Sequence, residues 1–234
     1  MKTPSKWRGL RRRLQAAWTG ITDPFARLSY SQEGEDLILE RILEGRDKGF
    51  YIDVGAHHPK RFSNTYRFYL KGWSGVNIDA TPGSMEPFRT VRPRDRNIEA
   101  AISADTRPIT FHLYNDPALN SAQPAEVRNI DPARHRVIRQ VTVTPRPLSE
   151  VLSSVITNGQ IIDFLTVDVE GLDLQVLRSN DWQRYRPALV LAEEVRRADR
   201  EHEGEITEFM RAQHYTELCR TMNTIFFRDD RGRL

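Results

Sequence analysis

The sequence contains little cysteine and no long apolar run. Its 234 residues include a single cysteine, Cys219, so an internal disulfide and a multi-cysteine metal site are both excluded. No stretch approaches the roughly 20 apolar residues that a membrane-spanning helix requires. The arginine-rich start also lacks the apolar core of a secretory signal. We therefore expect a soluble, cytoplasmic protein with one α/β domain over residues 29–234 and an N-terminal extension over residues 1–28.

Basic residues are unevenly distributed along the chain, which has 35 Lys and Arg against 32 Asp and Glu. Residues 1–22 hold six of the basic residues and no acid, which leaves 29 basic against 32 acidic residues in the remainder. A nucleic-acid-binding domain usually carries its basic excess on the folded face. We therefore expect no nucleic-acid partner.

Residues 5–21 have the pattern of a basic amphipathic helix. Trp and Leu recur at helical spacing, and the arginines fall mostly on the other side. Such a helix fits the anionic inner surface of a membrane, and it equally fits packing on the domain or on a second subunit. The sequence leaves the oligomeric state open.

From residue 29 the apolar pattern alternates between helices and strands. We expect helices at 29–45, 62–72, 172–179 and 203–213, with caps near Ser31 and Ser63, and core strands at 49–56, 74–80, 96–103, 161–171 and 186–194. Peripheral β structure at 108–115 and 139–152 should flank a polar loop or lid, and 215–220 should pair with 223–229. The alternation predicts a doubly wound parallel sheet whose ligand lies beyond the carboxyl ends of the strands.

The turn after the first strand, "DVGAHHPK", contains only one glycine, Gly55. A dinucleotide fingerprint needs G-x-G-x-x-G, but His57 and Lys60 occupy the other two glycine positions. The Tyr-x-x-x-Lys pair of many nicotinamide-dependent enzymes is also missing, because Leu70 stands four residues after Tyr66. These differences disfavour an NAD-dependent oxidoreductase or epimerase.

A carboxylate, Asp79, ends the second strand 24 residues after Gly55. At this place a carboxylate can accept hydrogen bonds from both hydroxyls of a ribose. Because the phosphate cradle is missing, the expected ligand is an adenosine without phosphates. S-adenosylmethionine fits that description.

Six motifs, in the same order, resemble those of the FkbM-type S-adenosylmethionine-dependent methyltransferases: "SQEGEDLIL", "YIDVGAHHP", "FSNTY", "GWSGVNIDA", "AAIS" and "FLTVDVEGLDLQVL". The resemblance covers roughly residues 29–195. It implies the class I methyltransferase fold, a Rossmann-like sheet of seven strands in the order 3-2-1-4-5-7-6 with an antiparallel last strand. It also implies methylation of hydroxyl oxygens in polysaccharide, glycolipid or natural-product biosynthesis.

The resemblance assigns most of the expected cofactor contacts by position. Asn64 and Thr65, at the start of the helix predicted at 62–72, are open between capping that helix and contacting the cofactor or acceptor. The predicted cofactor-binding residues are Asp53, Gly55, Ala56, Asn64, Thr65, Asp79, Ala80, Ala101, Ile102, Ser103 and Asp168.

Methyl transfer to a hydroxyl needs a group that removes its proton. Asp168 and Glu170 are two residues apart and share one face if their strand continues. Glu170 is the first candidate for the base and His57 the second, with Asp168 on the active-site floor. The expected acceptor is a sugar hydroxyl, and a non-sugar metabolite or a non-catalytic adaptor role are the alternatives.

We predict no metal ion. His57 and His58 are adjacent and should point apart, so both rarely reach one ion. A Mg²⁺ ion held by Asp168, Glu193 or Glu194 is the remaining metal hypothesis.

Overall fold

The structure is a computed structural model that describes residues 23, 25–123, 130–194 and 204–232. The predicted helix at residues 5–21 lies outside the described residues. Within the described part of the chain, no helix is long and apolar enough to cross a membrane.

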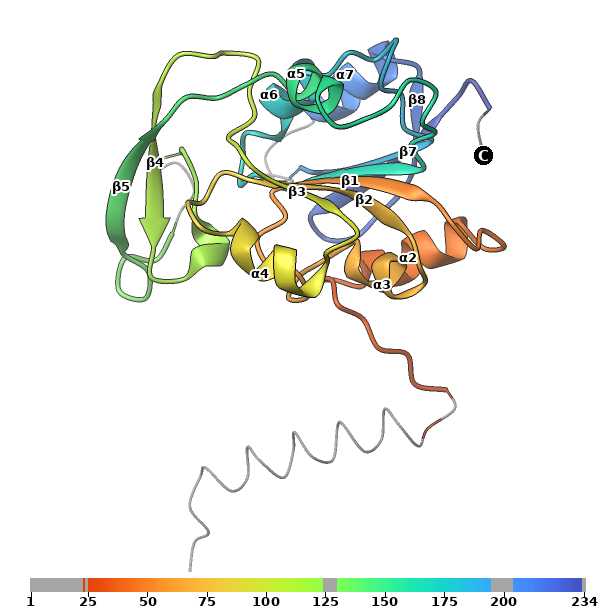
Figure 1. The fold of residues 1–234 in the computed structure, drawn as a ribbon, viewed down its shortest axis with the longest axis horizontal. Helices are drawn as coiled ribbons and strands as arrows, with labels where there is room; N and C mark the ends of the chain where they lie inside the picture. The colour runs from red at the N-terminus through yellow and green to blue at the C-terminus, as the bar shows by residue number, and fades with distance from the viewer. Residues whose placement is uncertain (1–22, 24, 124–129, 195–203, 233–234) are drawn as a thin grey trace, which may run out of the picture.

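A seven-stranded sheet forms the centre of the domain (Figure 1), with the order β3-β2-β1-β6-β7-β9-β8. The strands are β1 Phe50–Val54, β2 Ser74–Asp79, β3 Arg96–Glu99, β6 Phe164–Val167, β7 Leu189–Glu193, β8 Tyr215–Arg220 and β9 Thr224–Asp229. In the order of the sheet, β3, β2, β1, β6 and β7 pair in parallel, whereas β9 runs antiparallel to both β7 and β8. The predicted strand order and the antiparallel last strand are confirmed.

Helices cover both faces of this sheet (Figure 1). One face carries α2 Glu35–Ile42, α3 Tyr66–Leu70 and α4 Met85–Val91, and the other carries α5 Leu148–Ser153, α6 Asp173–Arg178 and α7 Glu205–Ala212. Side chains alternate along each strand, so that Tyr51 packs with Leu39 of α2 while Ile52 packs with Leu148 of α5. The strands are therefore apolar on both faces, as buried parallel strands usually are.

The first helix starts later than its predicted cap, Ser31, because α2 begins at Glu35 and Gly34 occupies the N-cap position. The Ser31 Oγ still accepts from the backbone N–H of Asp36 in the first turn at 3.3 Å, and it donates to the buried Asp36 carboxylate at 2.9 Å. The same carboxylate accepts from the backbone N–H of Tyr30 at 2.8 Å, so it organises the chain before the helix. Ser63 behaves as predicted, because its Oγ accepts from the backbone N–H of Tyr66 at 3.0 Å.

A second, two-stranded sheet stands at one side of the domain (Figure 1). Its strands, β4 Ile109–Tyr114 and β5 Val137–Val143, pair antiparallel. The predicted loop or lid between them is described in part, and contains the short 3₁₀ helix η1, Pro117–Leu119.

A fully buried arginine, Arg92, connects the end of α4 to the first two strands. Its Nε donates to Asp95 at 2.8 Å, and its Nη2 donates to the Tyr51 hydroxyl and to Thr65 Oγ1, both at 2.9 Å. Asp95 also accepts from the backbone N–H of Gly75 at 2.9 Å. This network joins β1, β2 and the start of α3, so it fixes the strands whose ends form the site.

Removing the charge of Arg92 should therefore destabilise the whole domain. Loss of one partner from a buried ion pair costs about 3–5 kcal/mol, so we expect Arg92→Met to lower the free energy of unfolding by that amount in a urea titration. Arg89→Met, at an exposed position of the same helix, is the control and should change it by less than about 0.5 kcal/mol. Similar losses in both variants would contradict a special contribution from the network.

Candidate active site

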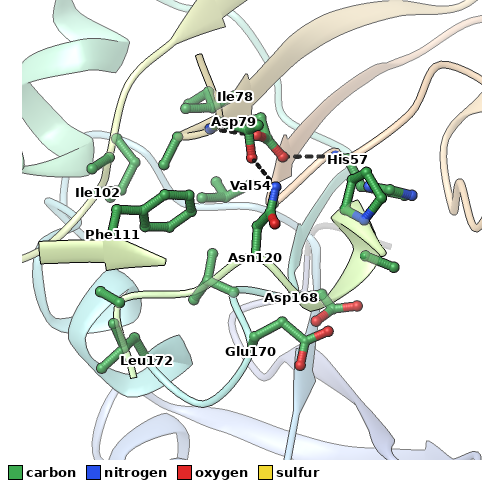
Figure 2. Close-up of a pocket in the computed structure, with 18 of the residues that line it drawn as sticks. Val54, His57, Ile78, Asp79, Ile102, Phe111, Asn120, Asp168, Glu170 and Leu172 are labelled. Carbon is green, nitrogen blue, oxygen red and sulfur yellow. Dashed lines mark hydrogen bonds between the residues drawn. The ribbon is translucent and has the colours of Figure 1, made fainter. Parts of the chain in front are cut away.

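A cavity lies at the carboxyl ends of β1, β2 and β6 (Figure 2), where a doubly wound sheet is expected to bind its ligand. The turns after these strands contribute Gly55, His57, Asp79, Ala80, Thr81, Asp168, Val169 and Glu170 to its lining. Side chains of β4 and residues 117–122 form a further wall.

Gly55 brings the turn after β1 against the turn after β6. Its φ is +85°, and a Cβ at this position would lie 1.7 Å from the backbone oxygen of Asp168. The strands are also joined here, because the backbone N–H of Asp168 donates to Val54 O at 3.0 Å. A glycine is thus required for the contact between the two turns, whatever ligand is bound.

Asp79 supports two turns and also faces the cavity. Its carboxylate accepts from the backbone N–H of His57 at 2.9 Å and of Thr81 at 2.7 Å (Figure 2). Each carboxylate oxygen has room for about two hydrogen bonds. The arrangement therefore combines a structural function at the strand end with acceptor positions suited to a ribose diol.

The wall beside Asp79 is apolar. Ala101 and Ile102 line it as predicted, but Ser103 does not, and the Ser103 Oγ accepts from the backbone N–H of Asp105 at 3.1 Å instead. Sequence reasoning missed Phe111 and Leu172, which complete this wall (Figure 2). The alternation in 108–115 predicted a strand there but not which of its faces meets the cavity.

Residues after β4 are hydrogen-bonded to the turns that follow β2 and β6. Asn120 Nδ2 donates to Thr81 Oγ1 at 3.1 Å, and Gln123 Nε2 donates to the backbone oxygen of Gly171 at 2.7 Å. This part of the predicted polar loop is therefore a packed wall of the site.

Three predicted cofactor residues lie behind the cavity wall. The buried Asp53 carboxyl accepts from Thr65 Oγ1 at 2.6 Å, and Ala56 packs with Phe88. Burial raises the pKa of Asp53 to about 6, against the opposing charge of Arg92. These residues support the turn after β1 without lining the cavity.

Asp168 and Glu170 both point their carboxylates into the cavity (Figure 2). The prediction that they share one face of a continuing strand is wrong, because β6 ends at Val167 and Glu170 adopts a φ of +59°. The turn, and not the strand, brings the two carboxylates together.

His57 lines the same cavity from the turn after β1 (Figure 2). Its backbone is left-handed, with φ +50°, and its side chain lines the cavity. Burial lowers the pKa of His57, so the imidazole is neutral near pH 7. Its Nε2 is buried and has no hydrogen-bond partner within the described residues, which leaves a polar atom for a ligand.

A smaller compartment adjoins the cavity. The two share Gln32, Phe62 and Asp168, and the remaining lining residues of the smaller one are Glu33, Glu35, Asn64, Glu193, Asn223 and Thr224. The structure thus places the predicted cofactor residue Asn64 in this second compartment, where its Nδ2 donates to Thr166 Oγ1 at 3.0 Å.

The two glutamates at the end of β7 face different surroundings. Glu193 lies in the second compartment, where burial and the charges of Asp168 and Asp173 raise its pKa. Its protonated carboxyl can donate a hydrogen bond to Asp168, and this bond raises the pKa further. Glu193 is therefore a neutral donor near pH 7.

Glu194 instead caps α7. Its carboxylate accepts from the backbone N–H of Ile206 at 2.8 Å and from Thr207 Oγ1 at 3.0 Å. The hypothetical Mg²⁺ ligand set of Asp168, Glu193 and Glu194 is therefore not assembled. No group of three His, Cys, Asp or Glu side chains that could hold a metal ion is found in the described part of the chain.

The cavity fits S-adenosylmethionine better than a dinucleotide. Its lining, as far as the chain is described, includes no Lys or Arg that could neutralise a diphosphate. Asp79 suits the ribose, the apolar wall suits adenine, and Asp168 suits the cationic methionine portion. His57 Nε2 supplies a further polar contact.

Strand order and cavity together define a class I S-adenosylmethionine-dependent methyltransferase. The sequence profile of the family described as "Methyltransferase FkbM domain" matches residues 53–217. The chain belongs to this family, and its cofactor is S-adenosylmethionine.

Several solved methyltransferases resemble the chain. A TehB-like S-adenosylmethionine-dependent methyltransferase from Corynebacterium glutamicum has 10% identity and a TM-score of 0.45, over 94% of this chain and 97% of the other. The 1,6-didemethyltoxoflavin-N1-methyltransferase of Burkholderia thailandensis, solved with S-adenosylhomocysteine, has 13% identity and a TM-score of 0.44, over 98% and 91%. A methyltransferase from Geobacter sulfurreducens has 12% identity and a TM-score of 0.40, over 94% and 96%. No curated protein matches the sequence.

Loss of the Asp79 carboxylate should weaken cofactor binding. We expect Asp79→Ala to reduce the calorimetric affinity for S-adenosylhomocysteine by about 1.5–3 kcal/mol, as for a lost hydrogen bond to a charged group. Glu99→Ala is the matched control, since Glu99 ends the neighbouring strand and accepts from the backbone N–H of Gly83 at 2.7 Å but does not line the cavity. Unchanged affinity in a folded Asp79→Ala protein would remove Asp79 from the site.

The raised pKa of Glu193 should make stability depend on pH. Its pKa rises from 4.5 to about 9 on folding. Between these pH values the folded state keeps a proton that the unfolded state has released, so the free energy of unfolding falls as pH rises from 4.5 to about 9. Glu193→Gln should flatten the decline and raise the free energy of unfolding at pH 8 by at least about 1 kcal/mol. Urea titrations from pH 5 to 9 test this, with Glu194→Gln as the control. An unchanged slope in Glu193→Gln would refute the assignment.

Proposed function

We propose that the protein transfers the methyl group of S-adenosylmethionine to a hydroxyl oxygen of a sugar in a glycan, a glycolipid or a glycosylated natural product. The observation that carries the proposal is the position of Asp168 and Glu170, whose carboxylates project into the cofactor cavity beside a second, polar compartment. Carboxylate and amide oxygens in that compartment accept hydrogen bonds, and hydroxyl groups are good donors to them. The resemblance of the motifs to hydroxyl-directed family members supports the same chemistry.

The bound cofactor supplies a methyl group already activated by a positively charged sulfur. The chain must then hold the acceptor oxygen in line with that methyl group and remove the hydroxyl proton. Glu170 is the proposed base, because its carboxylate projects into the cavity from a turn that fixes its direction. Asp168, hydrogen-bonded to Glu193, is the proposed partner of the cofactor ammonium.

His57 is the second candidate for the base. Its neutral imidazole can accept a proton at Nε2, which lies buried at the cavity wall. Its backbone N–H is fixed by Asp79, so the ring direction depends on the same carboxylate that is expected to hold the ribose.

A labelled-methyl assay on the purified full chain tests the proposal. Calorimetry should first show binding of S-adenosylhomocysteine and none of NAD⁺. Incubation with methyl-labelled S-adenosylmethionine and a panel of methyl glycosides should then yield sugar methyl ethers, which resist mild base. Exclusive labelling of non-sugar hydroxyl compounds would overturn the sugar acceptor, and binding of NAD⁺ alone would overturn the methyltransferase assignment.

In the same assay Glu170→Gln should lose turnover while keeping the cofactor. Removal of a general base lowers kcat by about 10²- to 10⁴-fold, whereas the affinity for S-adenosylhomocysteine should stay within about threefold, because amide and carboxylate have nearly the same shape. His57→Gln serves as the comparison. Normal turnover in Glu170→Gln would move the proton-accepting function to Asp168 or His57.

A further inference from the structure

Phe62 stands where the two compartments meet. It lines both of them, and the only other residues shared by the two described linings are Gln32 and Asp168. Phe62, Gln32 and Asp168 therefore form the boundary between the second compartment and the cofactor cavity.

The backbone of Phe62 is held in an unfavourable conformation. Its φ is +58°, a region that bulky residues rarely adopt. Within the described residues four non-glycine residues have positive φ, and three of them, His57, Phe62 and Glu170, line the cavity. Strain of this kind persists where the surrounding structure enforces it, and it gathers at functional sites.

The ring of Phe62 is fixed but not buried. It stacks near the His57 ring, with centroids 6.4 Å apart and an interplanar angle of 25°, and the Arg61 guanidinium carbon lies 4.3 Å from its centroid. Yet 41% of the residue is exposed. An aromatic ring held at the edge of a cavity, instead of in the core, offers an apolar surface to a ligand.

Around this ring the second compartment is acidic. Four carboxylic acids line it, Glu33, Glu35, Asp168 and Glu193, and its described lining contains no Lys, Arg or His. The Arg61 guanidinium beside the ring is ion-paired with Asp116 at 3.7 Å, so the acids of the compartment set the local charge and an anionic acceptor is repelled. Hydroxyl groups, in contrast, find hydrogen-bond acceptors. The compartment measures about 20 Å³, which is room for a single hydroxyl group and not for a sugar ring. It therefore suits one hydroxyl on the edge of an uncharged molecule whose apolar face lies outside it, on the exposed ring of Phe62, as a neutral pyranose would.

We propose that Phe62 is a positioning residue for the acceptor. Its exposed ring face packs on the C–H face of an uncharged pyranose, so that a hydroxyl is presented toward Asp168 and Glu170. This inference rests on the proposed function and adds a substrate class to it: neutral sugars are accepted, and phosphorylated sugars and uronic acids are rejected.

Substitutions at Phe62 separate this role from a structural one. Phe62→Gly removes the ring and suits a positive φ, so we expect Tm to be unchanged or higher. The affinity for S-adenosylhomocysteine should fall by less than the KM for the acceptor rises, because the ring only borders the cofactor cavity. The KM for the best neutral methyl glycoside should rise at least about tenfold, with a smaller change in kcat. Phe62→Trp, which restores an aromatic face, should keep KM within about threefold of the wild type. Wild-type KM in Phe62→Gly would overturn the proposal.

A binding measurement makes the test independent of turnover. In saturation-transfer NMR on the S-adenosylhomocysteine complex, ring C–H protons of neutral methyl glycosides should be saturated by the wild type and by Phe62→Trp, but not by Phe62→Gly. The 6-phosphate and uronic acid counterparts should give no signal. Equal saturation by wild type and Phe62→Gly, or binding of the anionic sugars, would overturn the role of Phe62, whereas absent methyl transfer to any glycoside would count against the proposed function.

Discussion

The buried ion pair of Arg92 and Asp95 is the interaction on which the geometry of the site depends. Two charges removed from water are tolerated only when every donor and acceptor around them is satisfied, and here the partners come from β1, β2 and the start of α3. Asn77 Nδ2 donates to Asp95 at 2.9 Å from the middle of β2. The Thr65 Oγ1 in turn donates to the carboxyl of Asp53, which lies in β1, two residues before Gly55 of the following turn. The position of that turn is thus set by a network on the α4 side of the sheet, out of contact with the cavity.

The cavity is formed where the turns after β1 and β6 pack against one another. Residues in both turns adopt unfavourable backbone conformations. Gly55 has no side chain to separate the turns after β1 and β6, so the backbones touch at the point where the sheet order reverses. On either side of this contact His57 and Glu170 adopt positive φ. Both side chains then line the cavity (Figure 2). The conformational strain is therefore coupled to the direction of the side chains proposed for catalysis.

The sequence predicted the arrangement of elements better than the direction of individual side chains. The alternation of apolar strands and helices predicted a doubly wound parallel sheet, and the resemblance to the family supplied the order of its strands. Asp53 and Thr65 were expected at the cofactor, but they turn inward to Arg92, which lies far along the chain and leaves no local signal. Phe111 was missed because the alternation in its predicted strand does not report which face meets the cavity, and Asn120 was missed because a short polar segment has no periodicity at all.

Carboxyl groups gathered in the cleft carry an electrostatic penalty that the fold does not relieve with a cation. Burial and mutual repulsion raise the pKa of Asp173 and of Glu193, while the described lining of the cavity contributes no Lys or Arg. The same arrangement disfavours a dinucleotide, whose phosphates add negative charge, and favours a ligand with a positive sulfur and an ammonium group. Glu193 limits the penalty by keeping its proton, so that it donates to Asp168 instead of repelling it. The carboxyl groups of the cleft therefore favour a cationic methyl donor in addition to the shape of the cavity.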